Sequence, residues 1–442
     1  MKKTGAKILA LMLAAAMMLG GCAGGTQKPE SDNKEAPTQT TEQEQNKGTD
    51  KKEHKELKTV TLGKLASREL ETFNYLQSQR AEDGENLTNL WEGLLTTNYK
   101  GQFLPQLATE WGTEDEGLTW TFKLRDDVTW VDVNGEIQAP CNGDDFATGL
   151  EWVLNFHKND SANTSMLIEM LSGAKEYYDY TKTLSTEEAY ALNAEDGSKF
   201  REMVGFETPD DLTVVYHCLA KKPYFDSLAT YNCLYPGPKE LLDEMGPEAY
   251  KAINNETMWY NGCYTMTEYL QGNEKIFTRN PLYWDKDCTL FDNVTFKMIE
   301  SGDISYQLYE NGEVDYVGLG EARVNTIAKN PNDPLYNYLV PDIPINRSFQ
   351  YHFNYNKMKE DGTPDTNWNT AIANEAFRKS WYYGLNLGDY YKRINAINPM
   401  VCENNFYTMK GLCYTSDGTD YVELVRNEMG LPKENGEKMV RL

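Results

Sequence analysis

The chain has 442 residues, which is long enough for two or three domains. Hydrophobic residues make up 40% and charged residues 25%, the balance of a globular protein, and the formal net charge is −25. Because a protein that binds a phosphate backbone needs a basic surface, this charge argues against a nucleic-acid partner. Aromatic residues reach 12%, and tyrosine and tryptophan suit both cores and the walls of binding clefts.

Residues 1–21 have the pattern of a secretory signal peptide. Lysines precede an apolar run, Ile8–Leu19, which is shorter than the roughly 20 residues that a membrane-spanning helix needs. The run ends in LGGC, which resembles the lipobox of bacterial lipoproteins. That resemblance implies removal of residues 1–21 and attachment of diacylglycerol to the thiol of Cys22. The alternative is an ordinary signal peptide followed by a chance cysteine.

Residues 22–56 are predicted to form a disordered tether. The segment after Cys22 contains no large apolar residue, so it cannot bury enough surface to offset the entropy of ordering. Such a segment would hold a folded domain away from a membrane surface.

Strands are predicted wherever apolar and polar side chains alternate. Residues 58–65 are a short candidate. In residues 118–125, Leu118, Trp120, Phe122 and Leu124 share one face. Two further stretches repeat the pattern, residues 211–219 with Leu212, Val214, Tyr216 and Cys218 and residues 293–300 with Val294, Phe296 and Met298.

Helices are predicted between these strands. Apolar residues in 85–95 recur at the spacing of an amphipathic helix. Ser185 and Glu188 have the spacing of a capping box, and residues 374–386 place Phe377, Trp381, Gly384 and Leu385 on one face, with Asn374 as a possible cap. Strands and helices mix without regular alternation, which predicts an α/β protein of more than one lobe with mixed sheets.

The eight cysteines and four histidines are scattered along the chain. They show no metal-ligand spacing, so neither a metal nor another cofactor is expected. Cys402 and Cys413 are close enough in sequence for a disulfide, but buried free thiols are favoured because no other spacing suggests a disulfide framework.

Motifs of catalysis are absent from the sequence. It contains no nucleophile elbow, phosphate-binding loop or HExxH pattern. The sequence contains two pairs of adjacent carboxylates, Asp126-Asp127 and Asp144-Asp145. Because side chains that are neighbours in sequence seldom point into one site, these pairs disfavour a glycosidase. The sequence therefore favours a binding protein over an enzyme.

Four stretches, in this order, resemble the extracellular solute-binding proteins of family 5, which serve ATP-driven importers. Residues 89–130 carry the early signature, which begins Trp-Glu-Gly-Leu, and residues 260–285 carry the Gly-x-Tyr…Asn-Pro-x-Tyr-Trp pattern. Residues 308–317 resemble the Gly-Glu-Val-Asp element. Residues 374–386 resemble a later helix, although its end departs from the Ala-Ile-Asp-Arg of the family.

The resemblance implies an α/β, type II (class C) periplasmic-binding-protein-like fold, with two hinged lobes, mixed sheets and an extra domain. Lobe I would comprise residues 58–95 and 215–330, and the extra domain residues 96–214. Residues 331–442 would begin lobe II. Members of the family usually continue further, so the second lobe is expected to be incomplete, either because the chain is truncated or because the rest lies elsewhere.

Two loops of lobe I are implied to touch the ligand, one before the Trp-Glu-Gly motif and one after the Gly-Glu-Val-Asp strand. Their residues are Gln79, Arg80, Ala81, Gly318, Leu319 and Gly320. Glycines would let a ligand approach the backbone closely, but the Tyr-Asn pair of the peptide binders is missing from the second loop. The alternative for each loop is a plain connecting turn.

The signature aromatic residues are predicted to be mostly structural. They are Trp91, Trp111, Trp120 and Trp130, and the pair Tyr283-Trp284 is likewise expected to pack rather than to stack on a ligand. A cluster of tyrosines could line a cleft, but a half-exposed helix face is favoured. The cluster contains Tyr382, Tyr383, Tyr390 and Tyr391.

The implied function is that of a lipid-anchored extracellular substrate-binding protein that delivers peptides to an ABC-type importer. Its partners would be a peptide, the permease subunits and, through Cys22, the membrane. It would act as a monomer on the extracytoplasmic face of the cell membrane. The alternatives are an oligosaccharide-binding member of the same family and a truncated lipoprotein that binds nothing.

Overall fold

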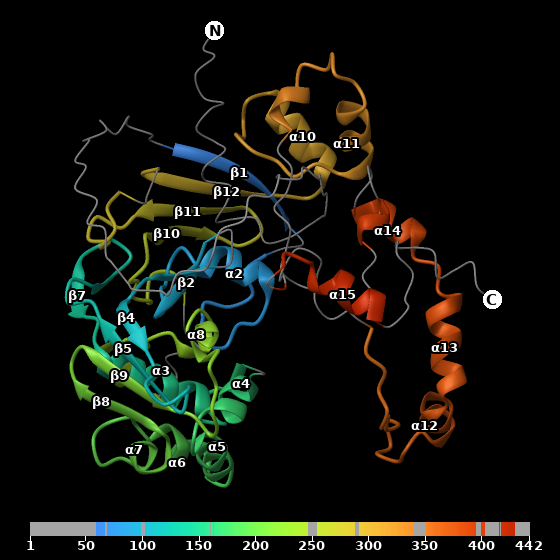
Figure 1. Cartoon of the computed structure of the whole chain (residues 1–442). Helices are drawn as coiled ribbons and strands as arrows, with labels where there is room; N and C mark the ends of the chain where they lie inside the picture. The colour runs from blue at the N-terminus through green and yellow to red at the C-terminus, as the bar shows by residue number, and fades with distance from the viewer. Residues whose placement is uncertain are drawn as a thin grey trace. The chain divides into compact units, whose positions relative to one another are not determined.

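The computed structural model describes residues 59–66, 69–98, 102–159, 161, 163–245, 254–287, 291–339, 351–394, 399–402, 415 and 417–428. The chain divides into two compact units, one spanning Glu53–Gly318 and one that includes Leu319–Leu442 (Figure 1). The predicted signal peptide, the tether and Cys22 lie outside the described residues.

The first sheet of unit Glu53–Gly318 joins segments that are far apart in sequence, in the order β1-β12-β11-β10 (Figure 1). β1 (Thr59–Leu65) runs parallel to β12 (Asn293–Ile299), and β11 (Glu274–Arg279) pairs antiparallel with both β12 and β10 (Tyr264–Leu270). On the other side of β1, Leu62 forms a parallel bridge with Tyr316. The strands predicted over residues 58–65 and 293–300 are confirmed.

The burial of β12 differs from the predicted alternation. Phe296 and Ile299 are buried, whereas Met298 is only partly buried. The reason is α10 (Gly302–Glu310), which contacts both β1 and β12. A methyl group added to Gly63 would meet Ile299 and Ser305 of α10, so Ile299 lies on the face that α10 covers.

The second sheet has the order β4-β5-β9-β8. β5 (Thr119–Leu124) pairs antiparallel with β4 (Ala108–Gly112) and β9 (Thr213–His217), and β8 (Phe206–Asp210) pairs with β9. Trp120, Phe122 and Leu124 are buried as predicted, although Leu118 is 38% exposed. β9 is an interior strand buried on both faces, so the single apolar face predicted for residues 211–219 describes only half of its packing.

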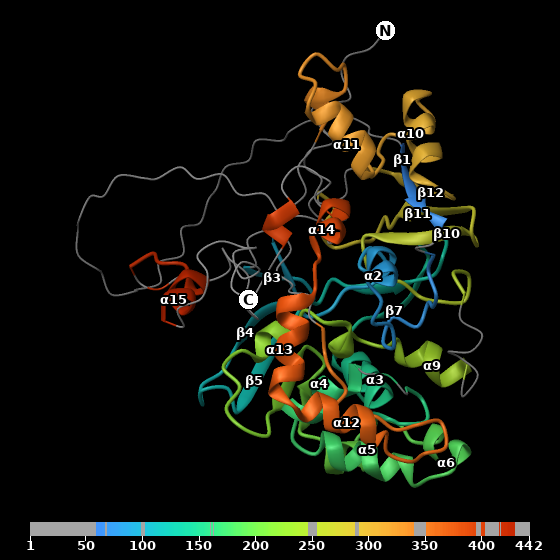
Figure 2. The ribbon, with the colours of Figure 1, turned by 90° about the vertical axis from the view of Figure 1, so that its right-hand side faces the viewer.

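Helices gather at the end of this unit opposite β1, as both views show (Figures 1 and 2). They follow the hairpin of β6 (Thr129–Val131) and β7 (Ile137–Pro140) and comprise α3 (Gly143–Leu154), α4 (Asn163–Met170), α5 (Ala174–Lys182), α6 (Thr186–Tyr190) and α7 (Lys199–Met203). Ser185 and Glu188 form the predicted capping box of α6. Further along lie α8 (Phe225–Leu228), the short turn η2 (Asn232–Leu234) and α9 (Lys239–Met245).

The helix predicted over residues 85–95 is wrong. α2 spans Ala81–Leu87, and the chain then turns into β2 (Leu95–Thr97), which pairs with β3 (Phe103–Pro105). The backbone between them bonds to distant segments: Leu90 O accepts from the N–H of Gly262, and Leu95 N–H donates to the carbonyl of Ala229. The apolar residues are nevertheless buried, so their spacing predicted burial correctly but not the backbone conformation.

The unit that includes Leu319–Leu442 is helical in its described part. It contains α11 (Glu321–Ala328), η4 (Tyr336–Tyr338), α12 (Thr366–Ala373), α13 (Glu375–Gly384), α14 (Gly388–Ile394), η5 (Pro399–Cys402) and α15 (Tyr421–Glu428). Asn374 caps α13 by accepting a bond from the N–H of Ala376, as predicted. Tyr390 is 55% exposed, which fits a half-exposed helix face.

Three of the described cysteines are buried inside the protein as free thiols. They are Cys141, Cys218 and Cys233, and burial raises the pKa of Cys233 to about 12. The disulfide that the sequence leaves possible between Cys402 and Cys413 involves Cys413, which lies outside the described residues. Within the described ranges no helix is long and apolar enough to cross a membrane, and no cluster of three or more ligand-type side chains could hold a metal ion.

Candidate functional site

The first predicted contact loop lies between β1 and α2. Gln79 and Arg80 are exposed, and Ala81 is the first residue of α2. Gln79 Nε2 donates to Ser161 Oγ at 2.7 Å, and the guanidinium of Arg80 pairs with the carboxylate of Glu71. These contacts hold both predicted side chains against other residues of the same unit.

The second predicted contact loop begins at Gly318, the last residue of its unit. The segment before it follows β1 in parallel, because Asp315 N–H donates to Thr61 O at 2.7 Å and Gly63 N–H donates to Tyr316 O at 3.0 Å. Carboxyl ends of parallel strands meet at one edge of a sheet. Gly318 and the loop that leads to Gln79 therefore leave the sheet at the same edge.

Leu319 and Gly320 belong to the other unit, so the predicted contacts are divided between the two units. Gly320 is the N-cap residue of α11. A side chain added at Gly318 or Gly320 would meet no atom within 4 Å. Packing in the described part of the chain therefore does not require glycine at either position.

The two specific signature stretches meet at the buried carboxylate of Glu92. Tyr283 Oη donates to its Oε1, and Trp284 Nε1 donates to its Oε2 at 2.8 Å. The backbone N–H of Glu92 donates to Asn261 Oδ1 at 2.9 Å. Glu92 is 4% exposed, and this burial raises the pKa of its carboxyl to about 7. The sequence showed both motifs but gave no signal that they share a hydrogen-bond network.

The signature tryptophans pack as predicted. Trp91, Trp120 and Trp130 are buried, while Trp111 is partly buried. Trp91 stacks on Tyr75 with ring centroids 4.5 Å apart. These rings build the core and leave little surface for a ligand.

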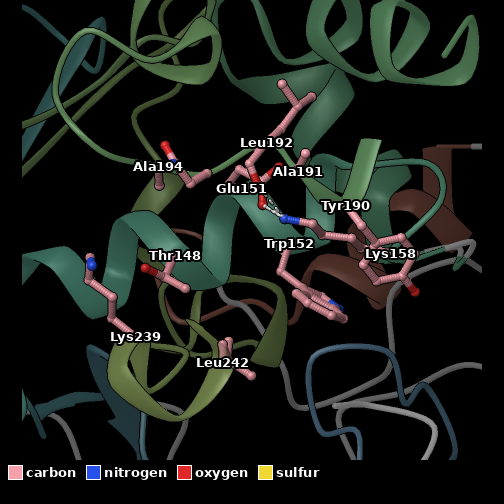
Figure 3. Close-up of a pocket in the computed structure, with 11 residues that line it drawn as sticks. Thr148, Glu151, Trp152, Lys158, Tyr190, Ala191, Leu192, Ala194, Lys239 and Leu242 are labelled. Carbon is pink, nitrogen blue, oxygen red and sulfur yellow. Dashed lines mark hydrogen bonds and ion pairs between the residues drawn. The ribbon is translucent and has the colours of Figure 1, made fainter. Parts of the chain in front are cut away.

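A pocket of about 170 Å³ opens beside α3 in the same unit (Figure 3). In it Glu151 and Lys158 face each other and form an ion pair at 2.6 Å. Lys158 Nζ also donates to Leu192 O at 2.8 Å. Oε1 of Glu151 accepts from the amide of Asn155 and from the hydroxyl of Tyr177.

The charged side chains of this pocket bind to each other and to the protein around them. Both oxygens of Glu151 are occupied by protein donors, so breaking the ion pair would leave a buried charge without its partner. No motif could have revealed the pair. The pocket contains none of the predicted contact residues, and neither does an open pocket of about 540 Å³ lined by Lys357, Met358, Lys359, Glu360, Asp361 and Asp365 in the other unit.

The adjacent carboxylates Asp144 and Asp145 differ in exposure and in hydrogen bonding. Asp145 is 2% exposed and accepts from the N–H groups of Asn142 and Lys239 and from the indole of Trp130. Burial raises its pKa to about 7. Asp144 is exposed at the surface, so the two carboxyls lie in different environments.

The fold is that of the type II periplasmic binding proteins, as predicted. The structure of the pheromone receptor PrgZ matches with a TM-score of 0.61 at 17% identity, over 83% of this chain and 64% of that one. Peptide-bound OppA of Listeria monocytogenes matches with a TM-score of 0.60 at 16% identity, over 85% and 69%.

Residues 102–397 match the family described as bacterial extracellular solute-binding proteins, family 5 (middle). The chain belongs to this family, which confirms the resemblance. AliA of Streptococcus pneumoniae, an oligopeptide-binding protein, is 24% identical over 81% of this chain and 52% of its own length. The periplasmic oligopeptide-binding protein OppA of Haemophilus influenzae is 30% identical over 57% and 42%. The chain spans about half the length of the curated relatives it matches.

Proposed function

We propose that this chain captures peptides outside the cytoplasm and serves an ABC-type importer as its substrate-binding component, with no catalytic step. The observation that carries the proposal is that the segments leading to Gln79 and to Gly318 leave the first sheet at the same edge, beside β1. The relatives support peptide as the ligand, since AliA is an oligopeptide-binding protein and OppA of Haemophilus influenzae was solved with the peptide RPPGFSPFR.

The proposed recognition uses the backbone more than side chains. Gly318 leaves open space beside the chain, so an extended peptide could approach its main chain and bond as an added strand does. Gln79 and Arg80 are exposed and offer polar groups on the neighbouring loop. Residues 58–95 and 215–330 would then act as lobe I, residues 96–214 as the extra domain and residues 331–442 as the start of lobe II.

Peptide binding is tested by thermal unfolding with libraries of short peptides and of oligosaccharides. We expect peptides to raise the midpoint, since a ligand at 100 times its Kd stabilises by about 2.7 kcal/mol. Gly318→Val should weaken peptide binding at least tenfold, because its side chain would occupy the open space. Gly112→Val is the matched control, since a side chain there also meets no atom within 4 Å. Stabilisation by sugars alone would contradict the proposal.

The proposal includes a lipid anchor at Cys22. We expect the protein to fractionate with membranes and to incorporate labelled fatty acid, and Cys22→Ser to lose the label and appear in the soluble fraction, since stable anchoring needs at least two acyl chains. Cys402→Ser is the control and should remain with the membranes. A membrane-bound, labelled Cys22→Ser protein would refute the anchor.

A further inference from the structure

The loop that leads to Gln79 is held from outside by two asparagine side chains. Asn163 Nδ2 donates to Leu76 O at 3.2 Å and to Ser78 O at 3.1 Å. Asn232 Nδ2 donates to Tyr75 O and, at 2.7 Å, to Ser78 O. The amides thus bind three of the four carbonyls in residues 75–78, which we call the carbonyl loop.

Ser161 binds the remaining carbonyl. Its hydroxyl donates to Gln77 O at 2.8 Å and accepts a bond from Gln79 Nε2 at 2.7 Å. One side chain therefore contacts both the carbonyl loop and a predicted ligand contact. Every carbonyl in residues 75–78 is bonded to a side chain that lies more than 80 positions away in the sequence.

The base of the loop is closed by Asp83 of α2. Its carboxylate accepts from Ser78 Oγ at 2.6 Å and from the N–H of Glu71 at 2.8 Å. Asp83 is 1% exposed and Asn163 is 3% exposed, so water cannot easily replace these partners. A buried carbonyl without a donor costs about 1–3 kcal/mol, and the path of the loop therefore depends on the amides that bind it.

We propose that Asn163 and Asn232 are positioning residues for peptide binding: by binding the carbonyl loop they keep Gln79 and Arg80 exposed at the edge where the ligand is captured. This inference rests on the proposed function. Asn163 starts α4, and Asn232 starts η2. Elements remote from β1 and α2 thereby set the geometry of the contact loop.

Asn163→Ala is the main test, with Asn280→Ala as its matched control. Asn280 is also 3% exposed, and its Nδ2 donates to a backbone carbonyl, that of Gly262, at 2.9 Å, away from the carbonyl loop. Both variants should lose similar stability, because each leaves a buried carbonyl without its donor. Only Asn163→Ala should weaken peptide affinity, by at least tenfold in calorimetric titration.

Ser161→Ala provides a variant that is safer for folding, because Ser161 is only partly buried. We expect its peptide affinity to fall several-fold with little change in unfolding midpoint. In both loop variants without peptide, the amides of Tyr75, Gln77 and Ser78, which donate to the carbonyls of Phe73 and Asn74 just before the loop, should exchange hydrogen faster than in the wild type.

The outcomes separate this inference from the function on which it rests. A wild-type protein that binds no peptide would overturn the proposed function and the inference together. A wild type that binds, with loop variants of equal affinity and equal exchange, would overturn the inference alone. Equal losses of affinity in Asn163→Ala and Asn280→Ala would also overturn it, since they would show a general effect of stability.

Discussion

Replacing Gly173 with alanine should lower the free energy of unfolding by about 2–5 kcal/mol. Gly173 adopts a left-handed conformation, with φ of 73°, which costs other residues about 1–2 kcal/mol. The added methyl carbon would also lie 1.7 Å from the carbonyl oxygen of Met203. That oxygen is part of the backbone, so the clash requires movement of α5 or of the segment that follows α7, at a further cost of about 1–3 kcal/mol.

Gly197→Ala separates these two causes. Gly197 has nearly the same backbone conformation, with φ of 74°, but a methyl group there would meet no atom within 4 Å. We expect it to lose only the strain of about 1–2 kcal/mol. Urea unfolding followed by tryptophan fluorescence measures both variants. Equal losses would contradict the packing described for Gly173, whereas insoluble Gly173→Ala beside soluble Gly197→Ala would be the extreme of the expected result.

Strand patterns predicted the fold best where a strand buries one face. β5 shows this clearly, because Trp120 and Phe122 alternate with partly exposed threonines. The pattern failed where burial came from two sides, as in β9, and where tertiary bonds replaced helical ones, as between Leu90 and Leu95. Apolar spacing reports which side chains are buried, and it specifies a helix only when the backbone bonds are local.

The sequence predicted candidate site residues only where they lie in or beside a recognisable motif. The Trp-Glu-Gly motif placed Gln79 on a loop, but the amide of Asn163, which binds that loop, comes from a position 87 residues beyond Leu76. Glu92 itself stands in the motif, yet its partners Tyr283 and Trp284 lie 191 and 192 residues away. Neither spacing nor composition could indicate that these groups meet, because the fold alone brings them together.

Glu92→Gln should remove a fall in stability that the wild type shows as pH rises. Burial raises the pKa of Glu92 to about 7 in the folded protein, from an ordinary value of about 4.5. The folded state therefore holds a proton that the unfolded state has released between these values, and stability is lost as pH rises through that window. The difference of about 2.5 pKa units corresponds to about 3 kcal/mol.

Glutamine has the shape of the protonated carboxyl and keeps an oxygen that can accept the indole N–H of Trp284. We expect urea unfolding at pH 5 to give similar stabilities for both proteins, and at pH 8.5 to show Glu92→Gln more stable by about 2–3 kcal/mol. Some decline of stability with pH should remain in the variant, because Asp145 is also buried with its pKa raised to about 7.

Glu110→Gln, at an exposed carboxylate, is the control and should follow the wild-type curve. A Glu92→Gln curve parallel to the wild type would show that Glu92 is ionised without cost, and that its side-chain partners Trp284, Tyr283 and Gln106 suffice to stabilise the charge.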